Sequence, residues 1–146
     1  MLITFYLSLY FKVYQPLFLQ FTYLCSMKLT KPLEVVYIYS FLTSTQEGDV
    51  VMYVAFDKYS QYAFEPYSCL MHKTDDDIKT AIETIVRNVF KEYNSLRHSR
   101  RTIIVTNLPQ ETNSIVENSH KNIYKVVSDV EKTEKFVIPI LDKMFS

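Results

Sequence analysis

The pattern of apolar residues in the middle of the chain predicts three consecutive strands. Residues 33–42 read LEVVYIYSFL and residues 50–57 read VVMYVAFD, and both runs are rich in β-branched and aromatic residues over the length of a strand. The polar run TSTQEGD between them holds the only glycine, which favours an antiparallel hairpin. A third run, QYAFEPYSCLM at 61–71, follows a short turn, and Pro66 indicates that this strand lies at an edge or carries a bulge. These residues predict an antiparallel meander.

After the meander, the pattern changes to that of a long amphipathic helix. Apolar residues recur at intervals of three and four and form one stripe of the helix: Ile78, Ile82, Ile85, Val86, Val89, Phe90, Tyr93 and Leu96. Thr74 can cap its N-terminus, and the acids Asp75, Asp76 and Asp77 lie where the helix dipole favours negative charge. We favour this interpretation of the three acids over a metal-binding cluster.

The C-terminal third predicts a strand, a weaker helix and a last strand. TIIVT at 102–106 is short and β-branched, and a strand entered from a helix favours parallel pairing through a crossover. Residues 114–130 offer apolar positions at helical spacing, and FVIPIL at 136–141 predicts a final strand that Pro139 limits to an edge. The predicted order is βββαβαβ, an α/β fold with a mixed five-stranded sheet and helices on its faces.

The first 26 residues differ from the rest of the chain. Residues 1–33 contain three lysines and no acid, whereas residues 34–146 carry a net charge of −3, so the neutral total of 16 basic and 16 acidic residues hides two unlike parts. Three interpretations of residues 1–26 stay open: an extension outside a domain that spans 27–146 and starts at Met27, a membrane-inserting helix, or a packed part of the domain. Lys12 and Gln20 lie in the middle of the segment and disfavour the membrane interpretation.

Composition excludes several classes of site. With Gly48 as its only glycine, the chain cannot form a Gly-rich phosphate-binding loop. Cys25 and Cys69 have no CxxC spacing, and the histidines at 72, 98 and 120 form no metal-binding pair, so we expect neither a metal nor another cofactor. A nucleophilic pair of Cys69 and His72 is disfavoured, because a structural buried cysteine is far commoner. Two unpaired thiols suggest a reducing, cytoplasmic compartment.

Two stretches resemble the integrase core of retroviral and insertion-sequence transposases. Residues 50–66, VVMYVAFDKYSQYAFEP, resemble the second and third strands of that family, with Asp57, Tyr59 and Ser60 at motif positions and Gln61 where arginine is usual. Residues 102–111, TIIVTNLPQE, resemble the fourth strand with its D-N-G-x-E-F ending. The resemblance spans roughly residues 33–141 and implies a ribonuclease-H-like fold.

The chemistry of the family needs three carboxylates that converge on two divalent metal ions. The first would lie near Tyr37 or Tyr39 in a strand without an acid, and the second falls on Asn107. An amide or a phenol replaces a carboxylate ligand of Mg²⁺ poorly. Of the second motif only Glu111 survives, and Asp142 lies at the separation expected for the third acid. The resemblance therefore implies a degenerate domain of mobile-element origin without strand-transfer activity, and a homodimer is a further expectation from the family.

Two other functions stay open: a small α/β protein-interaction module, and a nuclease that uses Mg²⁺ with a different acid set of Glu34, Asp57 and Asp142. We expect Asp57 to terminate its strand as a turn residue rather than to bind metal.

Weak DNA binding is a separate question, because it could be retained after catalytic activity is lost. Arg97, Arg100 and Arg101 form the densest basic cluster, with Lys91 nearby and Tyr93 able to stack on a base. We favour the simpler interpretation that these cations complement the C-terminus of the long helix.

Overall fold

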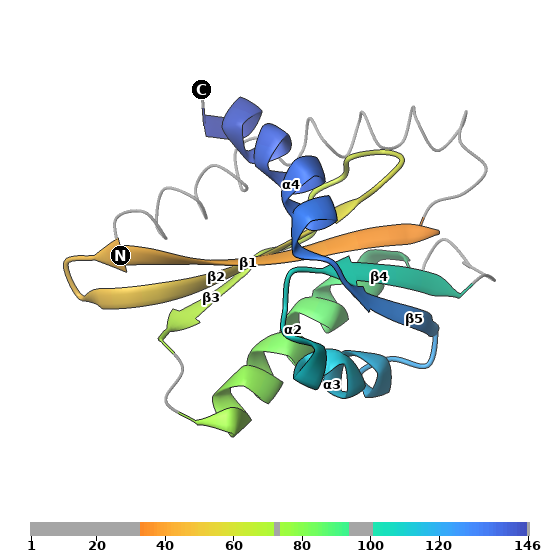
Figure 1. Ribbon diagram of the computed structural model, residues 1–146, viewed down its shortest axis with the longest axis horizontal. Coiled ribbons are helices and arrows are strands. Elements are labelled where there is room, and N and C mark those ends of the chain that lie inside the picture. Colours follow the sequence, from red (N-terminus) through yellow and green to blue (C-terminus); the bar gives the residue numbers. More distant parts are fainter. Residues whose placement is uncertain (1–32, 72–73, 94–100, 146) are drawn as a thin grey trace.

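The computed structural model describes residues 33–71, 74–93 and 101–145, which form an α/β fold around one mixed sheet (Figure 1). The five strands lie in the order β3-β2-β1-β4-β5, where β1 pairs antiparallel with β2 and parallel with β4. Their bounds are β1 Val35–Thr45, β2 Gly48–Asp57, β3 Tyr67–Leu70, β4 Thr102–Thr106 and β5 Ile123–Ser128. The helices are α2 Asp75–Tyr93, α3 Asn113–Asn118 and α4 Val130–Phe145, and a 3₁₀ turn at Gln110–Thr112 precedes α3. The predicted five-stranded α/β fold is confirmed.

The β1–β2 hairpin explains where the chain places its one glycine. Thr45 pairs with Gly48 across a two-residue turn, and Gly48 has a φ of 130°, a backbone conformation that other residues rarely adopt. Beyond Ile38, which pairs with Thr106, β1 extends past the last residue of β4. The hairpin therefore projects from the sheet as an arm, as Figure 1 shows.

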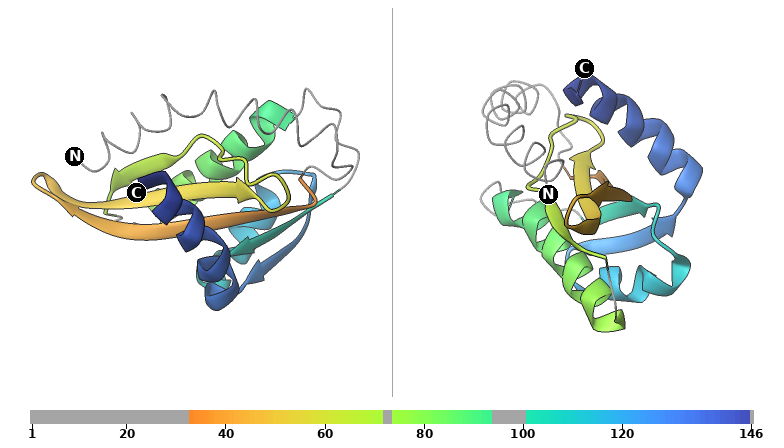
Figure 2. Two further views of the ribbon diagram at one scale, coloured as in Figure 1. Left: turned by 90° about the horizontal axis from the view of Figure 1, so that it is seen from above. Right: turned by 90° about the vertical axis from the view of Figure 1, so that its left-hand side faces the viewer.

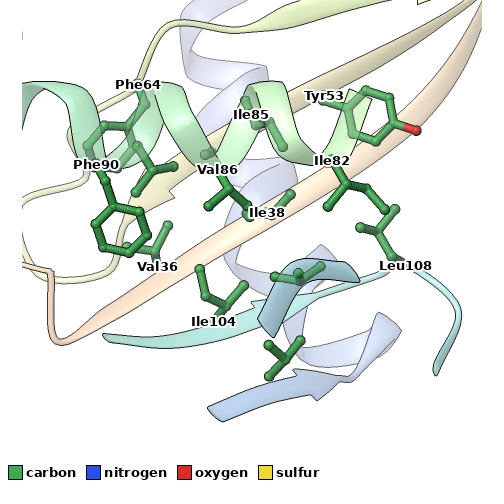
Figure 3. Close-up of a cluster of buried hydrophobic side chains, with 14 of the residues drawn as sticks. Val36, Ile38, Tyr53, Phe64, Ile82, Ile85, Val86, Phe90, Ile104 and Leu108 are labelled. Atoms are coloured by element: carbon green, nitrogen blue, oxygen red, sulfur yellow. The ribbon is translucent and has the colours of Figure 1, made fainter. Parts of the chain in front are cut away.

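Alternation along the strands divides the core between the two sides of the sheet. Val36, Ile38 and Ile104 point to the side covered by α2 and α3, where they pack on the apolar stripe of α2 (Figure 3). Tyr37 and Val105 point to the opposite side, where α4 packs. Figure 2 shows the two helical layers on either side of the sheet. Because the strand period is two, one residue of register shift would exchange these two surfaces.

The C-terminal prediction was wrong in two elements. The predicted helix over 114–130 is the short α3 followed by β5, and the predicted last strand at 136–141 lies inside α4. IYKVVS is β-branched and pairs in parallel with β4, so tertiary pairing overrides its helical spacing. In α4, burial of Val137, Ile140 and Met144 contributes roughly 1.5–3 kcal/mol for each side chain. That burial outweighs the penalty of about 3 kcal/mol for a proline in a helix interior.

Pro139 lies within α4 on its exposed side, and replacing it with alanine is expected to stabilise the domain. We expect the free energy of unfolding to rise by about 1–2 kcal/mol, because the helix penalty of proline exceeds its restriction of the unfolded chain. Urea denaturation measures this difference, with Lys132→Ala on the same helix as a control expected to change little. An unchanged or lower stability of Pro139→Ala would contradict the prediction.

Candidate functional site

The positions at which the resemblance expects the first two acids lie side by side on β1 and β4. Tyr37 pairs with Val105, and Asn107 directly follows the last residue of β4. Because β1 and β4 are parallel, the carboxyl end of β4 meets the middle of β1. Helix α4 packs against both strands on the side to which Tyr37 points. These three elements together form the candidate site.

Tyr37 is a core residue at this site. Its side chain is 3% exposed, and its ring stacks on Phe136 of α4 with a centroid separation of 4.3 Å and an interplanar angle of 16°. Burial raises the pKa of the Tyr37 phenol, and the neighbouring Asp129 and Tyr59 raise it further. A neutral, stacked phenol is suited to packing and not to binding a hard cation.

Tyr39 occupies the next position of β1 on the same side and is half-buried. Its ring stacks on Phe41 at 5.7 Å, and its pKa is raised by burial first and by Glu134 of α4 second. Neither of the two tyrosines offers a charged oxygen to the site.

The side chain of Asn107 takes the place that a further residue of β4 would have beside β1. Its Oδ1 accepts a hydrogen bond of 2.8 Å from the backbone N–H of Ser40, and its Nδ2 donates one of 2.7 Å to the backbone carbonyl of Ser40. The side-chain amide therefore satisfies both polar groups of one β1 residue where β4 has ended. Leu108 follows, buried to 6% exposure in the core, with its N–H bonded to the hydroxyl of Thr106. This turn has a structural role in anchoring the end of β4.

Converting Asn107 to aspartate, the residue type that the resemblance expects there, is expected to destabilise the domain. A carboxylate can accept from the N–H of Ser40 but cannot donate to its carbonyl, so we expect a loss of about 1–3 kcal/mol in the free energy of unfolding. Chemical denaturation of Asn107→Asp at pH 7 measures the loss. Gln110→Glu makes the same chemical change at an exposed side chain nearby and serves as the control. Equal stability of the two variants would contradict the structural role of Asn107.

Asp57 is a buried turn residue, as the sequence predicts. It is 0% exposed; its Oδ1 accepts from the N–H of Leu33 at 3.0 Å, and its Oδ2 accepts from both the N–H and the hydroxyl of Ser60 at 2.9 and 2.8 Å. Gln61 follows with a φ of 58° and an exposed side chain. Asp57, held by Ser60, therefore ties the turn after β2 to Leu33, two residues before the start of β1.

The remaining candidate acids do not converge. Glu34 is half-buried ahead of β1, Glu111 is exposed in the 3₁₀ turn, and Asp142 is exposed on α4. Within residues 33–71, 74–93 and 101–145, no three His, Cys, Asp or Glu side chains are grouped as a metal site would require. The proposed acid set of Glu34, Asp57 and Asp142 thus gains no support.

The N-terminus of α2 shows reciprocal capping. The Thr74 N–H donates to Oδ2 of Asp77 at 3.2 Å, and the Asp77 N–H donates to the Thr74 hydroxyl at 3.3 Å. These bonds support the prediction that Thr74 caps the helix and that the adjacent acids stabilise its first turn.

Several predicted residues lie outside the described part of the chain: Arg97, Arg100, His72, His98 and Cys25. Arg101 is exposed directly before β4, and Lys91 is exposed near the end of α2. Burial raises the pKa of the Cys69 thiol, and Asp77 raises it further, so this thiol is not activated as a nucleophile.

His120 is a residue whose role the sequence did not reveal. Its ring stacks on Phe90 of α2 at 4.0 Å with an interplanar angle of 3°, and its Nδ1 accepts from the N–H of Asn122. Burial lowers the pKa of His120, and the charge of Lys121 lowers it further. His120 therefore joins the α3–β5 connection to α2 in its neutral form.

This stack predicts a loss of stability in mild acid. The unfolded chain takes up the His120 proton near pH 6.5, but the folded chain takes it up only at lower pH. The unfolded state thus binds more protons in this window, and the free energy of unfolding falls as the pH drops below about 6.5. Urea denaturation at pH 7.5 and 5.5 should show a larger loss in the native chain than in His120→Phe, which keeps a stacked ring without titrating. Equal losses of unfolding free energy in the native chain and in His120→Phe would show that protonation of His120 does not cause the effect.

No model of a protein family matches the chain, and no curated protein matches it. Among the residues that the structure describes, no helix is long and apolar enough to cross a membrane.

Proposed function

We propose that the chain is an integrase-core-like domain with the ribonuclease-H-like fold, of mobile-element origin, that does not carry out DNA strand transfer. Support for the fold comes from the strand order β3-β2-β1-β4-β5, the parallel pairing of β1 with β4, and the long α2 between β3 and β4. Support for the origin comes from the resemblance of residues 50–66 and 102–111.

The proposed loss of activity rests on the stack of Tyr37 on Phe136. In the resembling family, a carboxylate from the middle of the first strand holds metal ions together with an acid at the end of the fourth strand and a third acid on a later helix. In this chain a buried phenol packs on α4 at the first position, and the Asn107 amide bonds Ser40 at the second. Neither group supplies the negative charge that Mg²⁺ prefers.

A nuclease and strand-transfer assay tests the proposal. The full chain is incubated with end-labelled DNA and Mg²⁺ or Mn²⁺, and we expect neither nicks nor joined products. Mn²⁺ binding is measured in parallel by electron paramagnetic resonance, and we expect the free-ion signal to be unchanged. Metal-dependent nicking that is abolished by a chelator and by Asp142→Asn would overturn the proposal and revive the alternative acid set.

We also propose that any remaining DNA binding is weak and electrostatic and runs through Arg97, Arg100 and Arg101. Counterion release makes such binding fall steeply as salt is raised. Fluorescence anisotropy with a DNA duplex at several salt concentrations measures the slope, and the triple alanine variant should abolish binding. Binding that survives this substitution would reject the cluster as the DNA contact.

A protein-interaction module is the second candidate function. It is favoured by large apolar side chains that stay exposed, among them Leu42, Leu70, Met71 and Tyr124 at 54–65%. A homodimer, as the family resemblance suggests, is the simplest partner. Sedimentation equilibrium over a range of concentrations tests it: a monomer at all concentrations would reject the homodimer.

A further inference from the structure

The outer half of β1 forms an open edge of the sheet. Even-numbered residues of β1 direct their backbone groups toward β4: Glu34 accepts a hydrogen bond from the backbone of β4, and both groups of Ser40 bond the side chain of Asn107. Leu42 and Ser44 continue this series beyond the end of β4, where Figure 1 shows the projecting arm. In the part of the chain that the structure describes, no strand pairs with β1 here, so the N–H and carbonyl groups of both residues face solvent. We call residues 41–45 on this side the open edge.

The two outer strands of the sheet are protected against pairing, whereas the open edge is not. Strand edges pair readily with other chains, and proteins block them with lysine, proline, bulges or very short strands. β5 carries the exposed Lys125 and a register shift against β4, and β3 has four residues and directly follows Pro66. The open edge reads FLTST, with no charge and no proline, and its Leu42 is exposed. An edge of this composition favours pairing with another strand.

Both ends of the open edge are fixed. β4 ends at Thr106, and the side chain of Asn107 occupies the next position beside Ser40. At the other end, β1 turns into β2 directly after Thr45. The five residues between these ends span about 17 Å at about 3.4 Å per residue. A strand that runs along the open edge toward Ser40 therefore has to end or turn at Asn107.

The open edge of a second copy meets this requirement when the two edges run antiparallel about a two-fold axis at Thr43. Leu42 of one copy then lies opposite Ser44 of the other, and each such pair exchanges two hydrogen bonds. The two pairs satisfy every open N–H and carbonyl group of both copies. An axis at Leu42 would set Ser44 against Ser40, whose groups Asn107 already binds, and an axis at Ser44 would set Leu42 against the hairpin turn. One register therefore fits.

The hairpin turn of each copy also falls at the required place. In this register, Thr45 of one copy lies opposite Phe41 of the other, so residues 46–47 turn back at Asn107 of the other copy. Each arm thus continues the line of the other copy's β4 beyond the point where that strand ends. On the α2 side, the two Leu42 side chains become diagonal neighbours, which shields apolar surface that is 55% exposed in one copy.

We propose that the chain forms a two-fold symmetric dimer in which the open edges of two copies pair antiparallel about Thr43. The sheets of the two copies then become continuous through their arms. The inference gives a surface to the homodimer named above, and it rests on the edge of β1 and not on the family resemblance. Five paired residues on each side are few beside the roughly 20–30 of a stable interface, so the dimer is weak and forms at high protein concentration.

Disulfide cross-linking of the full chain tests the register. Cys25 and Cys69 are replaced by serine, and a single cysteine is introduced by Thr43→Cys or by Thr45→Cys. The two threonines lie on the same side of β1 and are both half-buried, so Thr45→Cys is the matched control. In the proposed dimer, position 43 faces position 43 of the other copy with Cα atoms about 4.5 Å apart, a separation that a disulfide spans. The two copies of position 45 are four residues apart along the strands, about 14 Å, which is too far for a disulfide.

We expect oxidation with copper–phenanthroline to convert most of the Thr43→Cys variant into a covalent dimer and to leave the Thr45→Cys variant monomeric. Non-reducing electrophoresis at several protein concentrations measures the two yields. Equal cross-linking of both variants, or of neither, would overturn the proposed pairing. Far-UV circular dichroism verifies that each variant keeps its fold.

A charge on the open edge provides an independent test. Leu42→Lys is expected to raise the Kd of the dimer by about tenfold or more, because it places two lysines beside each other across the paired edges. Tyr124→Lys introduces the same charge at a residue of β5 that is 65% exposed, and it should leave the Kd unchanged. Sedimentation equilibrium measures both values. A chain that stays monomeric at every concentration, or a dimer that Tyr124→Lys weakens and Leu42→Lys does not, would overturn the pairing. Strand transfer is tested separately by the nuclease assay, so failure of either proposal leaves the other standing.

Discussion

Replacing Tyr37 with aspartate is expected to destabilise the domain strongly instead of restoring a catalytic acid. The substitution removes a buried ring, which by analogy with other large aromatic truncations costs about 3–5 kcal/mol, and it adds a carboxylate that is costly to bury. Domains of this size are stable by only about 5–15 kcal/mol. We therefore expect the free energy of unfolding to fall by about 5 kcal/mol at pH 7, measured by urea denaturation. The loss should be smaller in acid, where a buried carboxyl is protonated.

Tyr37→Phe is the matched control for this prediction. It keeps the ring that stacks on Phe136 at 4.3 Å and removes only the hydroxyl, so we expect a loss below about 1 kcal/mol. If Tyr37→Asp kept native stability and bound Mn²⁺, then the site would be an open metal pocket and the proposed loss of function would be refuted.

Removal of the Asp57 carboxylate is expected to have the second large effect. Asp57→Ala leaves three donors without their acceptor, two of them backbone N–H groups of Leu33 and Ser60, in a fully buried turn. Hydrogen bonds to a charged group contribute about 1.5–3 kcal/mol each but are not additive, so we expect a loss of about 3–5 kcal/mol. Thermal or urea unfolding of the full chain measures it.

Asp49→Ala provides the control for Asp57. The Asp49 carboxylate accepts one exposed hydrogen bond, from the hydroxyl of Ser44, so its removal should change the free energy of unfolding by no more than about 0.5 kcal/mol. Similar losses in the two variants would show that the turn after β2 does not depend on Asp57.

The elements that the sequence predicts well are those in which pattern and burial agree. The strands at 33–42 and 50–57 alternate in a way that matches the two sides of the observed sheet, and the stripe of α2 packs on the sheet. Over the last two elements, the sequence predicts a helix followed by a strand, whereas the structure has β5 followed by α4. A short β-branched run fits both the helical and the strand period, and Pro139 was given more weight than the apolar spacing around it. Pairing with β4 decides the first case, and packing of α4 on β1 and β4 decides the second. Neither contact is visible in the local sequence pattern.

The candidate site was predictable in its positions but not in its contacts. Counting from the resemblance leads to Tyr37 and Asn107, which do lie on adjacent strands. The partner of Tyr37 is Phe136, which the sequence analysis placed in a strand, so the stack could not be foreseen. The bond between Asn107 and Ser40 joins residues 67 apart in sequence and depends on where β4 ends. Such long-range register is set by the packed fold.

The amide bridge of Asn107 also marks the point along β1 at which backbone pairing on the β4 edge ends. Up to Ser40, the strand is held on both edges, first by β4 and then by the Asn107 side chain. From Phe41 to Thr45, within the described chain, only β2 holds it. The backbone amides of the inner half of β1 are therefore expected to exchange with solvent more slowly than those of the outer half, whose partner β2 is itself paired with β3 from Val50 to Tyr53.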